Sequence, residues 1–229
     1  MVRTDPSHGY ASASMVDPSY MGFGTEDITR LPASARQRLL EAPFLPMDGM
    51  NEHGLAMAHL AVPRAQAPQV TGQPTLGPLL MTRLVLDRAR TVPEALALLA
   101  RHNLQVGEPP LHFFLADATG RAAIVEYVEG EILVTSNDDL WLAVTNFIVA
   151  GTSPEIRPSL CSRYRTALAT LTASRGRMEV PEALALLSAV SQTSTMWSVA
   201  YEVTSGRLTV APGRDFRQPL AFGVSASRD

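Results

Sequence analysis

The chain has 229 residues, of which 46% are hydrophobic and 18% charged, so it is long enough to bury a substantial core. Its formal net charge of -3 comes from 19 basic and 22 acidic residues without long runs of one sign, which makes nucleic acid a poor partner. We expect a single domain over residues 1–229, because no Pro/Gly/Ser-rich linker divides the chain.

The usage of lysine and cysteine excludes several chemistries. All 19 basic residues are arginine, as in proteins from GC-rich bacterial genomes, so a lysine base or Schiff-base nucleophile is excluded. Cys161 is the single cysteine and cannot form an internal disulfide. Neither a signal peptide nor an apolar run near 18 residues is visible, so we expect a cytoplasmic protein without a membrane span.

The first half of the chain predicts loops, one strand and two helices. Residues 1–46 are rich in Ser, Pro and Gly and predict loops over a core, with a short helix near 35–40. Residues 48–55 predict a glycine-bracketed turn that leads into a buried strand over 55–62. A long loop over 63–78 and a helix over 79–88 follow, and Thr91 and Glu94 predict the start of a helix that ends near 102.

The second half predicts antiparallel strands and two further helices. Strands over 112–117, 121–128 and 131–135 are joined by short turns with hairpin chemistry. A strand over 141–145 ends at Asn146, helices cover 163–173 and 181–190, and a hairpin covers 197–203 and 207–210. Hairpins with helices in separate runs predict an α+β fold, and a helix–sheet–sheet–helix sandwich fits this order.

Standard catalytic and metal-binding motifs are absent from the sequence. The five histidines show no ligand spacing, and there is no Cys-x-x-Cys, Gly-x-Ser-x-Gly or phosphate-binding Gly-x-x-x-x-Gly-Lys. We therefore expect no metal and no cofactor. Cys161 lies at a predicted helix start, where the helix dipole lowers a thiol pKa, but a small apolar residue packed at that position is the simpler interpretation.

Several short blocks, in order, resemble one enzyme family. They include Asp-Gly-Met-Asn-Glu-His-Gly-Leu at 48–55, Ile-Val-Glu-Tyr at 124–127, Val-Thr-Asn at 144–146, Ser-Arg-Tyr at 162–164 and Thr-Met-Trp-Ser-Val-Ala-Tyr at 195–201, with further blocks over 83–87, 91–95 and 111–120. This set resembles the linear amide C-N hydrolases, which include choloylglycine hydrolases, penicillin V acylases and isopenicillin N acyltransferase-like proteins. The resemblance covers nearly the whole chain and implies the four-layer α-β-β-α sandwich of the N-terminal-nucleophile hydrolases.

The resemblance also implies roles for individual residues. In this family an N-terminal cysteine thiolate attacks an amide carbonyl and its own α-amino group is the base. Asn146 matches the asparagine that helps to hold the oxyanion, and Arg163 matches the arginine that keeps the thiol ionised. A turn residue and an arginine on a solvated helix face are the alternatives. His59 and Asn51 are candidates for substrate contacts, with packing and turn formation as their alternatives.

Two departures from the family pattern weaken the match. Ala61 stands where bile salt hydrolases have an asparagine, which argues against bile salts as substrates. Residues 1–24 contain no cysteine and no recognisable early arginine and aspartate of the family. We therefore expect a truncated enzyme, incomplete at its N-terminus, whose sheet shows an open edge or an apolar face.

Three functions remain open at this point. The first is hydrolysis or acyl transfer on a linear amide C-N bond of a small-molecule acyl amide, with the nucleophile missing from this chain. The second is a catalytically inactive member of the fold that binds a ligand or a partner. The third is an unrelated α+β binding domain, which would make the matching blocks a coincidence. Association into a homo-oligomer is left open as well.

Overall fold

The computed structural model describes residues 1–24, 26–137 and 140–224, and its largest element is a sheet of seven strands. The strands follow the order β1-β2-β3-β4-β7-β8-β9, and every neighbouring pair is antiparallel. Their bounds are β1 Val2–Thr4, β2 Ser12–Met15, β3 Asp48–Asn51, β4 Ala56–Ala61, β7 Leu111–Ala116, β8 Ala122–Val128 and β9 Glu131–Ser136.

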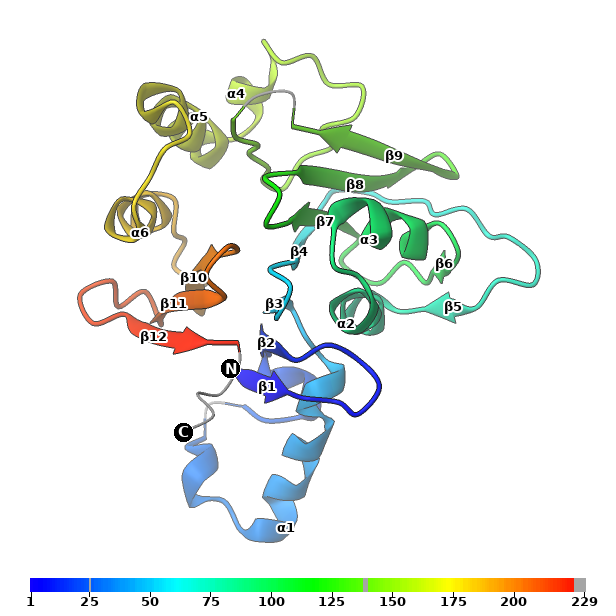
Figure 1. Cartoon of the computed structure of the whole chain (residues 1–229), viewed down its shortest axis with the longest axis vertical. Coiled ribbons are helices and arrows are strands. Elements are labelled where there is room, and N and C mark those ends of the chain that lie inside the picture. The colour runs from blue at the N-terminus through cyan, green and yellow to red at the C-terminus, as the bar shows by residue number, and fades with distance from the viewer. Residues whose placement is uncertain (25, 138–139, 225–229) are drawn as a thin grey trace.

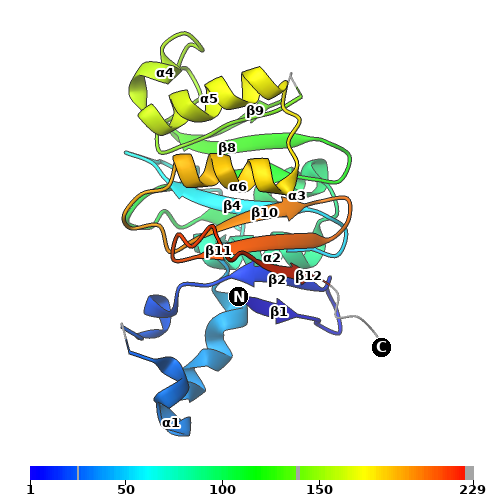
Figure 2. The same ribbon diagram turned by 90° about the vertical axis from the view of Figure 1, so that its left-hand side faces the viewer.

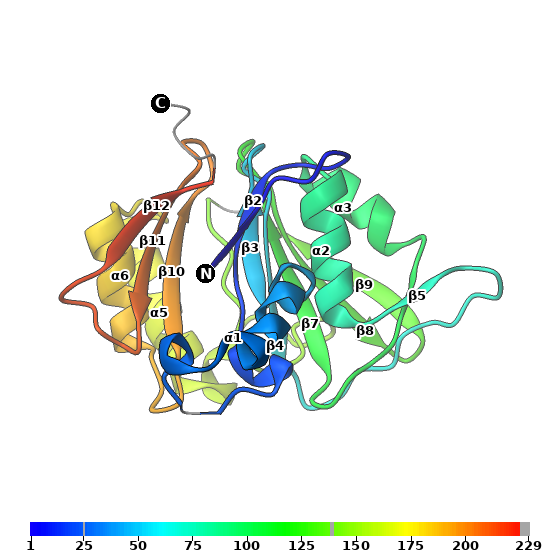
Figure 3. The same cartoon turned by 90° about the horizontal axis from the view of Figure 1, so that it is seen from below.

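A second sheet of three antiparallel strands faces the first one. It consists of β10 (Trp197–Glu202), β11 (Arg207–Pro212) and β12 (Leu220–Gly223). Helix α6 (Val180–Ala189) packs on β10 of the smaller sheet and α5 (Ser162–Ser174) lies beside α6, whereas α2 (Pro78–Arg88) and α3 (Val92–Leu99) cover the outer side of the larger sheet (Figures 1 and 3). The predicted α-β-β-α arrangement is therefore confirmed.

Strand periodicity explains why the central strands contribute side chains to apolar clusters on both of their faces. Phe113 and Leu115 on β7 and Val125 on β8 point toward α2 and α3 and join the largest apolar cluster. Ile124, one residue away on β8, points to the other face and packs with residues of the 141–164 segment. The central strands are therefore buried on both faces, which explains their nearly continuous apolar sequence.

The two sheets pack directly on each other. Met50 on β3 and Leu208 and Val210 on β11 are buried in a shared cluster between the sheets. Gly54, in the β3–β4 turn, has a φ of +76°, and a Cβ built there would lie 1.9 Å from the carbonyl oxygen of Val203. Only glycine fits both the backbone conformation and the close approach.

The front of the chain contains two strands that the sequence analysis assigned to loops. That prediction was wrong for β1 and β2, which extend the edge of the large sheet beside β3. The predicted short helix is confirmed as α1 (Ala33–Arg36) and the following 3-10 helix η3 (Gln37–Phe44). With η1 (Pro18–Met21) and η2 (Ile28–Arg30) these elements form a lobe, residues 17–24 and 26–45, which projects from the sandwich (Figure 2).

The block over 48–55 is only in part a turn. Asp48 to Asn51 form strand β3, and the turn is confined to the residues that follow, up to Gly54. Gly49 lies within the strand, where a Cβ would be 2.8 Å from the carbonyl oxygen of Ala13 and 2.9 Å from Cδ1 of Leu86. Its role is therefore a close approach between strand and helix and not a turn.

The predicted strand over 141–145 was also wrong. These residues have no regular secondary structure, although Leu142, Ala143 and Val144 pack against the apolar cluster on β8. An apolar run buried without a neighbouring strand does not form a ladder, and sequence alone does not distinguish the two cases. The short helix α4 (Arg157–Leu160) follows, and a small parallel pair of β5 (Thr75–Leu76) and β6 (Asn103–Leu104) completes the elements.

The remaining predicted strands and helices are confirmed, with ends shifted by a few residues. Within the described residues, β10 and β12 each pair only with β11, so both are edge strands of the smaller sheet. Whether a strand is missing at the front stays a prediction, as does the assignment of residues 1–229 to one domain.

Candidate active site

Asn146 is held by hydrogen bonds to two distant parts of the chain. Its Nδ2 donates to the carbonyl oxygen of Ala61 at the end of β4 at 2.8 Å, and its Oδ1 accepts from Nη2 of Arg163 at 2.7 Å. These opposite partners fix which way the amide group faces. The Nδ2 group has a second N–H, and Asn146 is exposed, so this donor is accessible to a ligand.

Arg163 reaches Asn146 from the first turn of α5. Cys161 occupies the N-cap position with extended backbone, and α5 begins at Ser162. Tyr164, the next residue after Arg163, is buried and packs edge-on against Phe147 with ring centroids 5.1 Å apart. The ring contact and the guanidinium–amide bond join the helix start to the Asn146 segment at two points, which brings the two predicted catalytic residues together.

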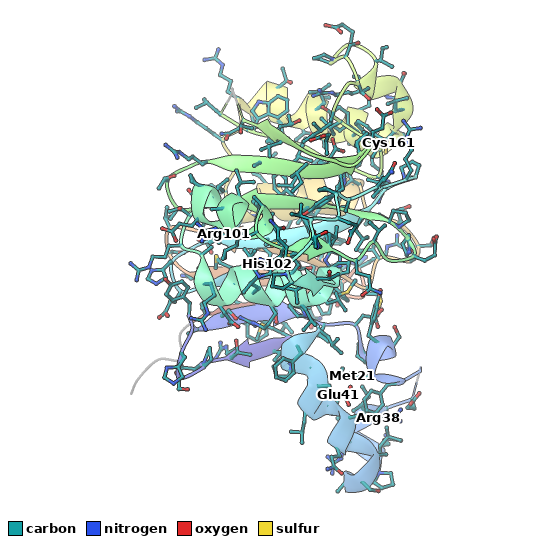
Figure 4. All side chains as sticks on the ribbon, turned by 90° about the vertical axis from the view of Figure 1, so that its right-hand side faces the viewer. Met21, Arg38, Glu41, Arg101, His102 and Cys161 are labelled. Atoms are coloured by element: carbon teal, nitrogen blue, oxygen red, sulfur yellow. The ribbon has the colours of Figure 1, made fainter. Side chains whose placement is uncertain are left out.

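Cys161 lies close to this pair, and its thiol is easier to ionise than usual. Burial raises its pKa. A larger lowering comes from the Thr145 side chain, from the amides of Tyr164 and Arg163 and from the charge of Arg163, so the net pKa is lowered. In Figure 4 Cys161 lies near the end of the molecule opposite the lobe that carries Met21, Arg38 and Glu41. The interpretation of Cys161 as a simple packing residue therefore leaves out its electrostatic environment.

His59 lines a cavity together with Ala61, the residue that binds Asn146. The cavity has a volume of about 300 Å³ and a largely apolar lining, made by Tyr20, Met47, His59, Ala61, Pro78, Leu79, Gly107, Glu108, Pro109 and Leu111. Burial lowers the pKa of His59 to about 4, and its Nδ1 is buried without a hydrogen-bond partner in the described residues. Ala61 links the cavity to the amide of Asn146, because its carbonyl oxygen accepts the Asn146 bond.

Asn51 has both side-chain atoms occupied by backbone partners. Its Nδ2 donates to the carbonyls of Leu86 and Ala89 at 2.9 and 2.7 Å, and its Oδ1 accepts from the amides of His53 and Leu55 at 3.1 Å each. The residue is fully buried. These bonds favour the turn-forming role that the sequence also allows, and they leave little capacity for a substrate contact.

The structure brings out a buried pair that sequence analysis missed. Nδ1 of His112 on β7 lies 3.0 Å from Oε1 of Glu126 on β8, and both side chains are 1% exposed. Glu126 also accepts from the amides of Val149 and Ala150, close to Asn146 in the chain. Glu126 stands in the Ile-Val-Glu-Tyr block, and a polar residue in the middle of a predicted buried strand was the available signal.

A second carboxylate joins the two sheets. Asp48 on β3 accepts hydrogen bonds from Nε1 of Trp197 at 2.8 Å and from the hydroxyl of Tyr201, both on β10. Burial raises its pKa and outweighs the effects of Tyr201 and Trp197, which lower it. The block that begins at Asp48 was predicted to be a turn, but Asp48 lies in strand β3.

Other described features lie apart from the predicted site residues. Across residues 1–24, 26–137 and 140–224, no group of three His, Cys, Asp or Glu residues could hold a metal ion. A larger hollow of about 570 Å³, bordered by residues 213–218 and Ser188, contains none of the predicted site residues. None of the helices that the structure describes is long and apolar enough to cross a membrane.

Solved structures with a similar arrangement of helices and sheets identify the class of fold. The chain matches penicillin V acylase from Agrobacterium tumefaciens with 21% identity and a TM-score of 0.58, covering 75% of this chain and 64% of the acylase. It matches a variant of conjugated bile acid hydrolase from Clostridium perfringens with 18% identity and a TM-score of 0.58, covering 78% of this chain and 73% of the hydrolase. These proteins are N-terminal-nucleophile hydrolases, and the chain has their fold.

Part of the sequence also matches a family model. Residues 37–144 match the family model of the linear amide C-N hydrolases, choloylglycine hydrolase family, and this match confirms the predicted resemblance. None of the curated proteins matches the chain. The family match ends just before Asn146 and Arg163, so the roles of these two residues remain proposals.

Proposed function

We propose that the chain provides the oxyanion donor and the acyl pocket of an enzyme that hydrolyses, or transfers the acyl group of, a linear amide C-N bond. In this proposal the nucleophile is the thiolate of an N-terminal cysteine, which these 229 residues do not supply. The observation that carries the proposal is the Asn146 amide, fixed between Arg163 and the Ala61 carbonyl with one N–H accessible.

Asn146 suits the stabilisation of a tetrahedral intermediate. Attack of a thiolate on the amide carbonyl places a negative charge on the carbonyl oxygen, and a fixed neutral N–H donor stabilises that charge without titrating. One such donor contributes about 2.7–4 kcal/mol to the transition state. Arg163 orients the donor through Oδ1, and its positive charge favours ionised groups near the start of α5.

The apolar cavity beside Ala61 suits the acyl part of the substrate. Its volume of about 300 Å³ falls at the lower end of the range for small-molecule sites. The His59 side chain in its wall is neutral above about pH 4, so it contributes a polar edge without a charge. We therefore propose His59 as a substrate-contacting residue and an uncharged acyl group as its ligand.

The first experiment tests binding with the chain itself. Penicillin V is titrated into ¹⁵N-labelled protein, and we expect the side-chain NH₂ signals of Asn146 to shift on saturation. Asn146→Ala should weaken binding, whereas Gln192→Ala, at an exposed amide residue just after α6, should not. Saturable binding that leaves the Asn146 signals unchanged would contradict the proposed site.

The second experiment tests the chemistry. The 229-residue chain should not release the acyl group of penicillin V, whereas a form extended by upstream in-frame codons that encode a cysteine should do so in an iodoacetamide-sensitive manner. Turnover by the 229-residue chain that disappears in Cys161→Ser would refute the assignment of the nucleophile. Binding without turnover in both forms would favour the alternative, an inactive ligand-binding member of the fold.

A further inference from the structure

The segment that carries Asn146 depends on other parts of the chain for its position. Residues 141–150 have no helix or strand hydrogen bonds, and the local bonds are limited to short turns such as Phe147 N–H to the Thr145 carbonyl at 3.0 Å. A loop held so weakly by itself samples several conformations unless tertiary contacts select one. The contacts that select it therefore determine where the Asn146 amide points.

Glu126 makes three of these contacts, all to backbone amides of the segment. Its Oε1 accepts from the amide of Val149 at 2.8 Å, and its Oε2 accepts from the same amide at 3.1 Å and from that of Ala150 at 2.6 Å. His112 provides a further contact to Oε1 at 3.0 Å. Burial raises the pKa of Glu126, but the bonds from His112, Val149 and Ala150 lower it by a larger amount, so the net pKa is lowered.

His112 gives the carboxylate a third partner, through Nδ1 of its ring. Its Nε2 is buried and has no hydrogen-bond partner among the described residues. A proton on Nε2 would be buried without an acceptor, so the tautomer with the proton on Nδ1, which donates to Glu126, is favoured. The negative charge of Glu126 is then compensated by three N–H donors, two of them from the backbone of the Asn146 segment.

We propose that the Glu126–His112 pair positions Asn146 for oxyanion stabilisation, an inference that rests on the function proposed for Asn146. The bonded amides begin three residues after Asn146, and the buried Phe147 and Val149 belong to the same apolar cluster as Tyr164. Tyr164 in turn follows Arg163, which holds Oδ1 of Asn146. One buried carboxylate on β8 thus fixes the Asn146 segment, and this segment packs through Phe147 against the helix start that orients the amide group.

The test compares Glu126→Gln with Glu131→Gln, at an exposed glutamate on β9, in the 229-residue chain. The side-chain amide that replaces the Glu126 carboxylate cannot accept from both backbone amides and His112 as before, because one of its two ends is a donor. We expect hydrogen exchange at Val149 and Ala150 to become at least about tenfold faster. The Asn146 side-chain NH₂ signals should move toward the chemical shifts of a solvated amide, while unfolding stays cooperative. Glu131→Gln should show neither the faster exchange nor the shifted Asn146 signals.

His112→Gln is the second variant, and it keeps the result decisive if Glu126→Gln fails to fold. It leaves both carboxylate oxygens on the loop amides and weakens one contact, so we expect smaller changes in the same direction. Unchanged Asn146 signals in a folded variant whose Val149 and Ala150 amides exchange faster would overturn the inference, because the pair would then stabilise the loop without positioning Asn146. Unchanged exchange would overturn it as well.

Failure of this inference and failure of the proposed function are distinguishable. The exchange rates and the Asn146 signals are measured without a substrate, so they report positioning alone. Penicillin V binding is then measured on the same variants. If the wild-type chain does not bind while its Asn146 signals still depend on Glu126, the function is wrong and the positioning is right.

Discussion

Two carboxylates, Glu126 on β8 and Asp48 on β3, end with opposite pKa shifts. Burial raises the pKa of both groups, but only Glu126 has a lowered net pKa. Glu126 accepts from two backbone amides and His112, whereas Asp48 accepts from the side chains of Trp197 and Tyr201. Burial is the largest single cause at both groups, and the hydrogen bonds outweigh it only at Glu126, which is therefore the carboxylate that is stable as an anion.

This difference separates two roles in the sandwich. The Glu126 side chain joins a strand to an irregular segment without helix or strand bonds of its own, and it needs its charge to hold two amides. The Asp48 side chain joins two strands that already belong to packed sheets, and a neutral carboxyl could accept the same bonds. We expect mutations to reveal this difference in both size and pH dependence.

The largest effect is expected from Glu126→Ala. The substitution leaves His112 and the amides of Val149 and Ala150 without their acceptor in a buried place, at a cost of about 3–5 kcal/mol of unfolding free energy. Denaturant unfolding measures this loss. The exposed Glu131→Ala should stay within about 0.5 kcal/mol of the wild type, and a loss below about 1 kcal/mol at Glu126 would contradict the comparison.

The next effect concerns His59, a titratable group whose Nδ1 is buried and has no partner in the described residues. Its folded pKa of about 4 lies below the ordinary 6.5, so the unfolded chain binds more protons between these pH values. Stability should therefore fall by up to about 3 kcal/mol as the pH drops from 6.5 to 4, which unfolding curves across this range measure. His59→Leu should remove this slope, whereas His8→Asn, on an exposed residue, should keep it.

A smaller effect should distinguish Asp48→Asn from Glu126→Gln by the sign of its pH dependence. The folded pKa of Asp48 is raised, so ionisation of Asp48 lowers the unfolding free energy. As the pH falls, the unfolding free energy of the wild type should therefore rise relative to that of Asp48→Asn. The folded pKa of Glu126 is lowered, so the advantage of the wild type over Glu126→Gln shrinks as the pH falls through that pKa. For Asp48→Asn we expect changes in unfolding free energy within about 1 kcal/mol. Unfolding curves from about pH 3 to 7 measure the pH dependence of both variants relative to the wild type. The same sign of pH dependence for both variants would refute the distinction.

The smallest effect is a change in rate at Cys161. Its lowered pKa predicts faster alkylation by iodoacetamide at about pH 7 than for a free cysteine. Arg163→Gln should slow the reaction roughly threefold, as expected for the loss of a partly exposed charge worth under about 1 kcal/mol. Arg165→Gln, at an exposed residue of the same helix, serves as the control, and equal slowing in both variants would show that the effect is not specific to Arg163.

The sequence predicted the fold best where a strand has its partners close by in the chain. The β7–β8–β9 hairpins consist of apolar strands separated by turns that contain glycine. Their predicted bounds agree with the observed ones within a residue or two. Strands β1 and β2 were missed because they contain only three and four residues and take their order from the distant β3. Residues 141–145 were overpredicted, because apolar character indicates burial and not the presence of a partner strand.

For the candidate site, the resemblance indicated residues but not the bonds that hold them. Asn146 and Arg163 came from short family blocks, and the structure joins them at 2.7 Å. Glu126 and His112 could have been paired from the register of the predicted hairpin over 112–128, which places them opposite each other. The bonds from Glu126 to Val149 and Ala150 could not be inferred, because they connect a strand with a segment whose path follows no repeating pattern.

The close contact at Gly54 has a consequence for the whole sandwich. No side chain separates the two sheets there, since a Cβ would lie 1.9 Å from the Val203 carbonyl oxygen. The contact lies at the beginning of β4, and Ala61, which binds Asn146, lies at its end, about 20 Å away for six residues of strand. Any side chain at position 54 would therefore displace either the β3–β4 turn or Val203, and with it the direct contact between the two sheets.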